Sequence, residues 1–192
     1  MKKNMRQTLR STIGPLCILL VSLLAASPVI HATDLAGLHT VTLHGNAGER
    51  VLLGQIAFTA RESGYAFEFT PNRAAFEERF LAMRPFLCLD GAAHSLCHFP
   101  YRSPRMIQGD DLTDLEYQFM FLQKPRAAVS LDPQNGVYYE MKRTAKGIEG
   151  TLREVDMTPI IVLEGDMIRP IRRENLFPVD LTRKWLPRLT IE

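Results

Sequence analysis

The sequence predicts an α+β domain that is mainly antiparallel β-sheet: a twisted sheet or partly open barrel of hairpins, with one covering helix and one disulfide-stapled hairpin. Three observations predict this class. Short runs of alternating apolar and polar residues recur, turn residues separate them, and two cysteines lie on the two arms of one hairpin. Because no long linker interrupts residues 33–192, they are expected to form a single globular domain.

The first 32 residues have the pattern of a signal peptide. Basic residues without an acid precede an apolar run over 16–26, and Ser27-Pro28 and Ala32 follow as a cleavage region. The run is shorter than the ~20 residues that span a bilayer, so cleavage is favoured over an uncleaved anchor. The expected location is periplasmic or secreted, with no membrane span after cleavage.

Removal of this leader changes the charge balance. The leader holds 4 of the 23 Lys and Arg residues and none of the 21 Asp and Glu residues, which leaves 19 against 21 in residues 33–192. The resulting net charge of −2 is unlike the strong positive charge of a nucleic-acid-binding domain. No nucleic acid is therefore expected as a partner.

The mature chain begins with a predicted meander of three antiparallel strands. Turn residues separate three alternating runs, at 45–48 and at 62–64. Gly54-Gln55 interrupts the second run and indicates a bulge. The three runs are residues 38–44, 50–59 and 65–69.

The next segment predicts the covering helix, over about 72–83. Phe76, Phe80 and Met83 recur at helical spacing, and Pro85 ends the pattern. Such a helix is expected to cover one face of the sheet.

Residues 84–101 predict the stapled hairpin, with a turn at Asp90-Gly91. Cys88 and Cys97 lie on its two arms, and in an exported chain they are expected to form a disulfide. Their spacing is not C-x-x-C and no adjacent Lys or Arg would lower a thiol pKa, so a structural bridge is favoured over a redox pair. Closing this short loop is worth about 2.5–3 kcal/mol.

The remaining elements follow the same signals. Residues 110–122 fit both a helical stripe and a strand; a short helical turn that passes into a strand is favoured, with Asp110 or Asp111 as its cap. Hairpins are predicted from 137–143 with 148–155 and from 160–163 with 167–171. Short strands are predicted at 129–131 and 189–191.

Few residues suggest catalysis. If His98 met the carboxylates of the acidic segment in a pocket, the set would suit acid/base chemistry, although a helix cap and a solvated acidic turn explain the same acids. The acids are Asp110, Asp111, Asp114 and Glu116. No Gly-x-Ser-x-Gly motif and no phosphate-binding glycine loop occurs in the sequence.

No metal and no cofactor is expected. His94 and His98 would lie about 13 Å apart on a strand, and Cys97 loses its thiolate when oxidised.

A basic and aromatic surface beside the stapled hairpin is the second candidate site. An exposed tyrosine near one of its arginines would suit a groove for a peptide, a glycan or an acidic ligand. Tyr138 and Tyr139 are adjacent and point to opposite faces of a strand, so one lies outside the core unless both faces are covered. The candidate binding residues are Arg84, Tyr101, Arg102, Arg105, Tyr138 and Tyr139.

Several short runs resemble a set of uncharacterised bacterial proteins. They are Met83 to Phe86, Cys97 to Tyr101, Asp111 to Tyr117, Asn135 to Tyr139, Glu154 to Met157 and Trp185 to Leu189. The resemblance covers roughly the last two thirds of the mature chain. It implies one structural unit and brings no assigned activity.

The function that the sequence favours is an exported, non-catalytic binding module of the cell envelope. Its partner would be an envelope protein, a peptide or a glycan. The alternative is a small envelope hydrolase that uses His98 with the carboxylates of 110–116. A structural component of a larger envelope assembly is a third class that the sequence leaves open.

Overall fold

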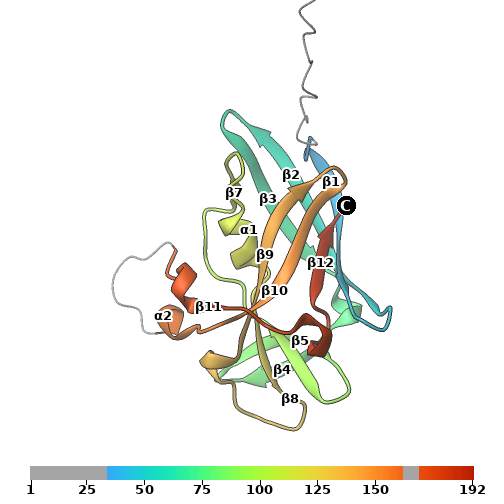
Figure 1. Cartoon of the computed structure of the whole chain (residues 1–192), viewed down its shortest axis with the longest axis vertical. Coiled ribbons are helices and arrows are strands. Elements are labelled where there is room, and N and C mark those ends of the chain that lie inside the picture. The colour runs from blue at the N-terminus through green and yellow to red at the C-terminus, as the bar shows by residue number, and fades with distance from the viewer. Residues whose placement is uncertain (1–33, 162–168) are drawn as a thin grey trace, which may run out of the picture. The chain divides into compact units, whose positions relative to one another are not determined.

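The computed structural model describes residues 34–161 and 169–192, which belong to one compact unit, Ala32–Glu192 (Figure 1). The predicted signal peptide, residues 1–32, lies outside the described residues. Within the described part of the chain, no helix has the length and apolar character needed to cross a membrane.

The strands form one antiparallel sheet, as the sequence predicts. Its order is β4-β5-β6-β8-β9-β10-β12-β1-β2-β3-β7, with β11 added against β10. The sheet does not close, and β4 and β7 are its two ends. The strands are β1 (Gly37–His44), β2 (Arg50–Arg61), β3 (Gly64–Pro71), β4 (Glu77–Leu81), β5 (Arg84–Asp90), β6 (His94–His98), β7 (Met106–Ile107), β8 (Phe121–Pro125), β9 (Gly136–Thr144), β10 (Gly147–Val155), β11 (Leu176–Phe177) and β12 (Arg188–Ile191).

The predicted meander and the predicted bulge are both present. Strands β1, β2 and β3 pair in sequence order. Val41 pairs with Gly54 but Thr42 pairs with Leu52, so Leu53 is the extra residue of a bulge in β2.

The hairpin of β9 with β10 and the last strand are also confirmed. The last strand, β12, pairs with β10 on one side and with β1 on the other, so the end of the chain joins the two halves of the sheet. Figure 1 shows β12 beside β10 and β1.

The predicted covering helix over 72–83 is wrong. Arg73–Ala75 is a single 3₁₀ turn (η1), and β4 follows it and pairs with β5. Phe80 and Met83, which produced the helical pattern, are 76% and 92% exposed and therefore mark no buried helix face. Pairing with β5 satisfies the backbone groups along one edge of β4 in place of helical hydrogen bonds.

The segment 110–122 is a short helix that passes into a strand, as predicted. Helix α1 spans Thr113–Gln118 and β8 follows it. The predicted cap is wrong, because Leu112 rather than Asp110 or Asp111 occupies the N-cap position. Asp111, one residue before it, accepts a hydrogen bond from the Thr113 N–H through Oδ1 at 3.0 Å, which gives this acid a structural role at the helix start.

Two other predicted elements differ from the structure. Residues 129–131 form no strand but lie in the segment between β8 and the 3₁₀ turn η2 (Pro133–Asn135). The first arm of the predicted hairpin at 160–171 begins within helix α2 (Thr158–Ile161), and residues 162–168 lie outside the described residues. Two further 3₁₀ turns are η3 (Arg173–Asn175) and η4 (Leu181–Arg183).

The core covers both faces of β9. Tyr139 packs in the larger hydrophobic cluster, whereas Tyr138 packs in a second cluster on the other face. Helix α1 contributes to both, through Leu115 and Tyr117 respectively. Because both faces are covered, Tyr138 and Tyr139 are both buried, and neither provides the exposed tyrosine that a binding surface would use.

Candidate functional site

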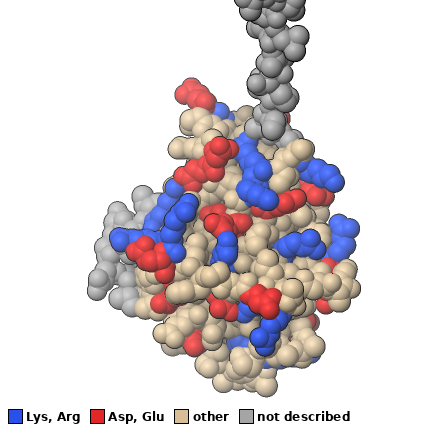
Figure 2. All heavy atoms as spheres, in the orientation of Figure 1, with Lys and Arg blue, Asp and Glu red and all other residues tan. Residues whose placement is uncertain are grey.

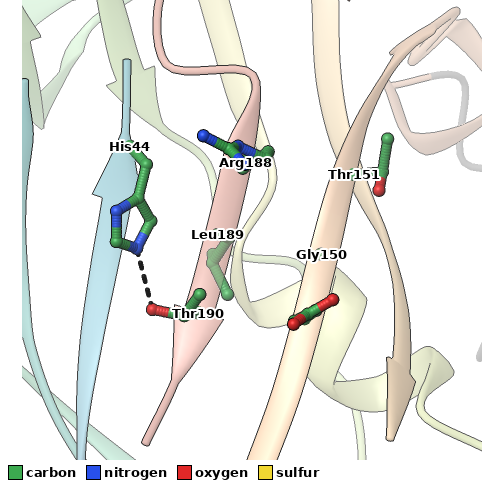
Figure 3. Close-up of a pocket in the computed structure, with 7 residues that line it drawn as sticks. His44, Gly150, Thr151, Arg188, Leu189 and Thr190 are labelled. Atoms are coloured by element: carbon green, nitrogen blue, oxygen red, sulfur yellow. Dashed lines mark hydrogen bonds between the residues drawn. The ribbon is translucent and has the colours of Figure 1, made fainter. Parts of the chain in front are cut away.

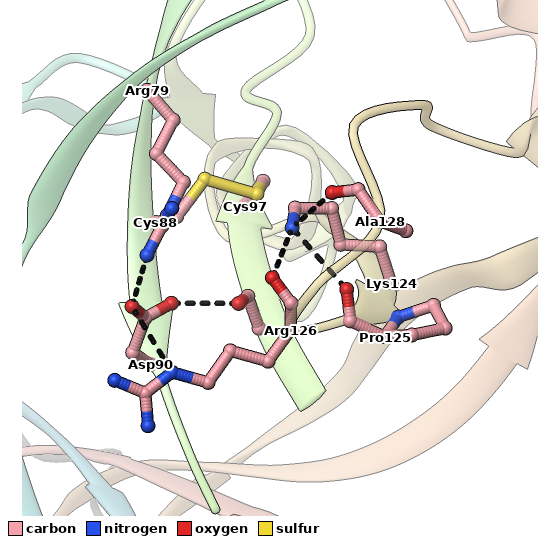
Figure 4. Close-up of a disulfide and its surroundings, with 9 residues drawn as sticks. Arg79, Cys88, Asp90, Cys97, Lys124, Pro125, Arg126 and Ala128 are labelled. Atoms are coloured by element: carbon pink, nitrogen blue, oxygen red, sulfur yellow. Dashed lines mark hydrogen bonds and ion pairs between the residues drawn. A yellow bond between two sulfur atoms is a disulfide. The ribbon is translucent and has the colours of Figure 1, made fainter. Parts of the chain in front are cut away.

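The predicted disulfide forms between Cys88 of β5 and Cys97 of β6 (Figure 4). The two residues are directly paired across the strands, and both are fully buried. Their burial fits a structural bridge, since a thiol must be accessible to exchange.

A network of charged groups supports the hairpin next to this disulfide (Figure 4). Asp90 accepts hydrogen bonds from the Ser95 hydroxyl at 2.6 Å and from the Arg79 guanidinium, and Arg126 lies 3.9 Å away. Burial acts to raise the pKa of Asp90, but the hydrogen bonds from Ser95 and Arg79 hold it below its ordinary value. The carboxylate is therefore ionised and fixes the end of the hairpin.

Lys124 organises the segment that follows β8. Its side chain is only 2% exposed, and its Nζ donates to the carbonyl oxygens of Pro125, Arg126 and Ala128 at 3.3, 3.2 and 2.7 Å. The three carbonyl oxygens satisfy the donors of the buried ammonium group, and they hold this segment together with the backbone hydrogen bond from Ala128 N–H to the Pro125 carbonyl oxygen.

An apolar pocket of about 290 Å³ lies against the stapled hairpin, and we call it the hairpin pocket. Phe86 lies two residues before Cys88 on β5, so its side chain is on the same face of the sheet as the disulfide. Of the lining residues that the structure describes, all except Arg84 have apolar side chains. The lining residues are Ala82, Arg84, Phe86, Phe99, Leu122, Leu131, Pro133 and Ile160.

Among the described residues that line the hairpin pocket, Arg84 is the one with a charged side chain. Its guanidinium carbon lies 4.6 Å from the ring centroid of Phe86 and 4.6 Å from that of Phe99. The two rings are nearly parallel, with an interplanar angle of 19° and centroids 6.2 Å apart. Cation–π contacts of this kind fix the plane of the guanidinium while leaving its edge donors in solvent. Within the described ranges, no carboxylate forms an ion pair with Arg84.

The turn at the edge of the hairpin pocket is conformationally strained. Ala82 and Met83 have φ values of 46° and 64°, in the left-handed region that disfavours residues with a Cβ. Met83 is also 92% exposed. A tight hairpin turn requires positive φ at both central residues, and Ala82 and Met83 adopt it in place of the usual Asn and Gly. Residues held in this way are found more often at functional sites than elsewhere.

The acidic candidates lie elsewhere, beside a polar pocket of about 280 Å³ that we call the α1 pocket. Glu116 lines it and is held by two donors: the Tyr138 hydroxyl and, at 2.7 Å, the Met141 N–H. Burial raises the pKa of Glu116 although both hydrogen bonds act to lower it. The α1 pocket is lined by Asp110, Asp111, Leu112, Thr113, Glu116, Tyr138, Glu140, Met141, Ile171, Arg172, Arg173 and Leu176.

Asp114 does not line the α1 pocket and has structural partners. It is 1% exposed, pairs with the Arg169 guanidinium at 3.0 Å and accepts the Met106 N–H at 3.1 Å. Arg169 also pairs with Asp111 at 2.6 Å, so one guanidinium joins both acids.

His98 is not brought to these carboxylates. Its Nε2 donates to the Gln118 carbonyl oxygen at 2.7 Å, and its ring packs against Phe69, Phe76 and Phe121. Burial lowers the pKa of His98 to about 4, so the imidazole is neutral at pH 7. The residues that the sequence combined for hydrolysis therefore lie in two separate environments.

Of the candidate binding residues, only Arg84 lines the hairpin pocket. Arg102 and Arg105 are exposed in the segment between β6 and β7, and Tyr101 packs edge-on against Tyr117 at 5.6 Å. The sequence did not indicate Leu122, Leu131 or Ile160, because they come from segments far apart in the chain. Phe99 could have been found from the sequence, because it lies two residues after Cys97 and an alternating pattern places both side chains on the same face of the hairpin.

Charge and metal-ligand patterns add no further site here. Acidic and basic side chains are interspersed on the face shown in Figure 2, so local groups rather than a broad field decide what binds there. Among the residues that the structure describes, no three or more His, Cys, Asp and Glu side chains gather as metal ligands.

Comparisons with protein-family models, with curated proteins and with solved structures found no match. The resemblance to uncharacterised bacterial proteins therefore stays a prediction. The functional argument rests on the geometry of the chain itself.

Proposed function

We propose that the chain is an exported, non-catalytic binding module of the cell envelope. Its hairpin pocket would take an apolar side chain that has a carboxylate beside it, on an extended segment of a partner protein. The observation that carries this proposal is the position of Arg84, stacked at 4.6 Å on both Phe86 and Phe99 beside a pocket whose other described lining side chains are apolar.

The apolar lining supports the first half of this ligand. Transfer of an apolar side chain from water into such a pocket is favourable at roughly 25 cal/mol per Å² of buried apolar surface. A pocket of about 290 Å³ is at the small end of ligand sites. It therefore suits one or two side chains better than a large cofactor.

Arg84 supports the second part of the proposed ligand, the carboxylate. A guanidinium presents paired N–H donors that match the two oxygens of a carboxylate. Stacking on Phe86 and Phe99 orients these donors in advance, which reduces the entropy cost of binding. A carboxylate would also neutralise a cation that has no acidic partner among the described side chains.

Export is supported by two features. The leader has the composition of a signal peptide, and Cys88 and Cys97 are paired as expected in an oxidising compartment.

The hydrolase alternative is less well supported by this geometry. It would have to act without His98, whose ring is buried among phenylalanines. Glu116 would have to act while both of its oxygens accept hydrogen bonds, from Tyr138 and Met141. Binding at the hairpin pocket requires neither the exposure of His98 nor the release of Glu116 from its two hydrogen bonds.

A fluorescent probe tests the pocket directly. The probe 8-anilinonaphthalene-1-sulfonate combines apolar rings with an anion and brightens when its rings leave water. We expect saturable binding that Arg84→Gln weakens by about tenfold, the effect of losing one charge-assisted hydrogen bond. Arg102→Gln is the matched control, because Arg102 is exposed on the neighbouring segment and does not line the pocket. Equal affinities for both variants would overturn the assignment.

Photo-crosslinking tests the partner. A photoreactive residue at position 83, in cells that export the chain, should give one main adduct with an envelope protein. The adduct should disappear when Arg84→Gln is added, whereas the same photoreactive residue at the exposed position 61 should not give it. An adduct that is indifferent to Arg84→Gln would contradict the proposal.

A further inference from the structure

A row of basic side chains crosses the sheet at β2, β1 and β12. His44 of β1 is directly paired with Arg50 of β2 on one side and with Arg188 of β12 on the other. Directly paired residues point to the same face of a sheet, so two guanidinium groups flank one imidazole. Thr151 of β10 continues the row next to Arg188. We call these four residues the His44 row.

A hollow of about 190 Å³ lies along this row (Figure 3). Thr190, two residues after Arg188 on β12, is short and leaves space between the longer side chains of Arg188 and Glu149. His44 Nε2 and the Thr190 hydroxyl are 2.9 Å apart and hydrogen-bonded. The hollow is lined by His44, Glu149, Gly150, Thr151, Arg188, Leu189 and Thr190.

The charges of the His44 row are not balanced within the described residues. Neither Arg50 nor Arg188 forms an ion pair there, and the two guanidinium groups come from β2 and β12, on either side of β1. Glu149 is the one acid among the described residues that line the hollow, and it forms an ion pair with Lys142 at 3.9 Å. An anion from outside would remove this imbalance.

We propose that this hollow is a second binding site, for a phosphate-type anion held by Arg188 and His44, with Arg50 adding its charge and the hydroxyls of Thr190 and Thr151 completing the contacts. The anion is either a free phosphate or the phosphate of a lipid headgroup. The site lies on different strands from the hairpin pocket and does not depend on the function proposed for that pocket.

The site should be pH-dependent. Burial, and after it Arg50 and Arg188, lower the pKa of His44, while Glu192 acts to raise it. The other ionisable group of the hollow is Glu149 on β10. A bound dianion stabilises the imidazolium, so it should raise the pKa of His44, and affinity should increase as the pH falls through that pKa.

The first test uses sulfate, a tetrahedral dianion whose charge is constant over the pH range of a histidine. NMR titration of the His44 ring resonances should show saturable shifts and a higher pKa with sulfate than without it. Arg188→Gln should weaken binding by about tenfold, and Arg50→Gln should weaken it to a smaller extent. Arg61→Gln is the matched control, because Arg61 is exposed at the far end of β2.

The second test separates the two sources of phosphate. Inorganic phosphate should shift the same resonances if the ligand is a free anion. Co-sedimentation with phosphatidylglycerol vesicles, but not with phosphatidylcholine vesicles, and its loss in Arg188→Gln, would identify a lipid headgroup. A cooperative thermal unfolding transition will show that each variant is folded. If Arg188→Gln does not fold, Thr190→Val provides an independent variant with which to test anion binding. An unmoved His44 resonance together with no vesicle binding, or equal weakening by Arg61→Gln and Arg188→Gln, would overturn the site.

Discussion

The hydroxyl of Tyr138 donates a hydrogen bond to the carboxylate of Glu116, and this contact links α1 to β9. Both side chains are buried, at 4% and 9% exposure, and the second Glu116 oxygen accepts the Met141 N–H. The sequence assigned Glu116 to a catalytic set and Tyr138 to a binding set. Their pairing shows that both serve first to fix the helix on the sheet.

The contact between Tyr138 and Glu116 leads to a testable prediction about the pKa of Glu116. Because the Tyr138 O–H stabilises the ionised carboxylate, Tyr138→Phe should raise the already elevated pKa of Glu116 further. A raised pKa in the folded state means that stability falls as the pH rises from the unfolded-state pKa to the folded-state pKa, and this loss should be larger in the variant. Carboxyl ¹³C NMR measures the pKa. Tyr139→Phe should leave it unchanged, because the Tyr139 hydroxyl donates to the Leu186 carbonyl oxygen.

His98 predicts acid sensitivity. Its pKa is lowered from 6.5 to about 4 by burial, so between these pH values the unfolded chain takes up a proton that the folded chain does not. Its contribution to stability is therefore complete above pH 6.5 and is lost toward pH 4, by about 3 kcal/mol in total. Urea unfolding at pH 7 and pH 4.5 should show a smaller loss for His98→Gln, which keeps a donor for the Gln118 carbonyl. Equal losses in both proteins would contradict this role.

The disulfide should matter for stability more than for binding. Replacing both cysteines, Cys88→Ala with Cys97→Ala, should lower the free energy of unfolding by about 2–3 kcal/mol, because the unfolded chain regains freedom. For a domain of this size, that corresponds to a melting temperature lower by roughly 4–10 °C. Thermal unfolding of the wild type with and without reductant provides the comparison. A melting temperature that neither change affects would refute a structural bridge.

The strained turn offers a stabilising variant. Ala82→Asn with Met83→Gly places residues that tolerate positive φ at both turn positions, and should stabilise the fold by about 1–2 kcal/mol. Met83→Leu is the control, since it keeps the strain. If Met83 contacts the partner, the double variant, added as an unlabelled competitor in the photo-crosslinking experiment, should displace the adduct less well than the wild type, so stability and affinity should change in opposite senses. Unchanged chemical denaturation curves would show that the turn stores no strain.

The sequence was sufficient to predict those elements whose pattern lies within a short segment of the chain. Alternation and turn residues indicated the β1–β3 meander and the β9–β10 hairpin, and the compartment argument paired Cys88 with Cys97. Residues 72–83 misled because Phe76, Phe80 and Met83 have helical spacing, while the pairing of β4 with β5 depends on a neighbour that local periodicity does not include.

The candidate sites were predictable only in part, for a similar reason. Arg84 was a candidate because it adjoins the stapled hairpin, and it lines the pocket there. The other walls of that pocket and the His44 row are set by strand order and register. In particular, β12 lies between β10 and β1, and this long-range placement brings Arg188 to His44.

The terminal strand β4 has a consequence for solubility. An unpaired strand edge can recruit further strands from other copies and so start fibril growth. Glu77 and Glu78 are exposed on β4, and Arg79 follows them, so a second copy approaching edge to edge would meet its own charges. Charged residues on a short terminal strand oppose edge-to-edge association of this kind.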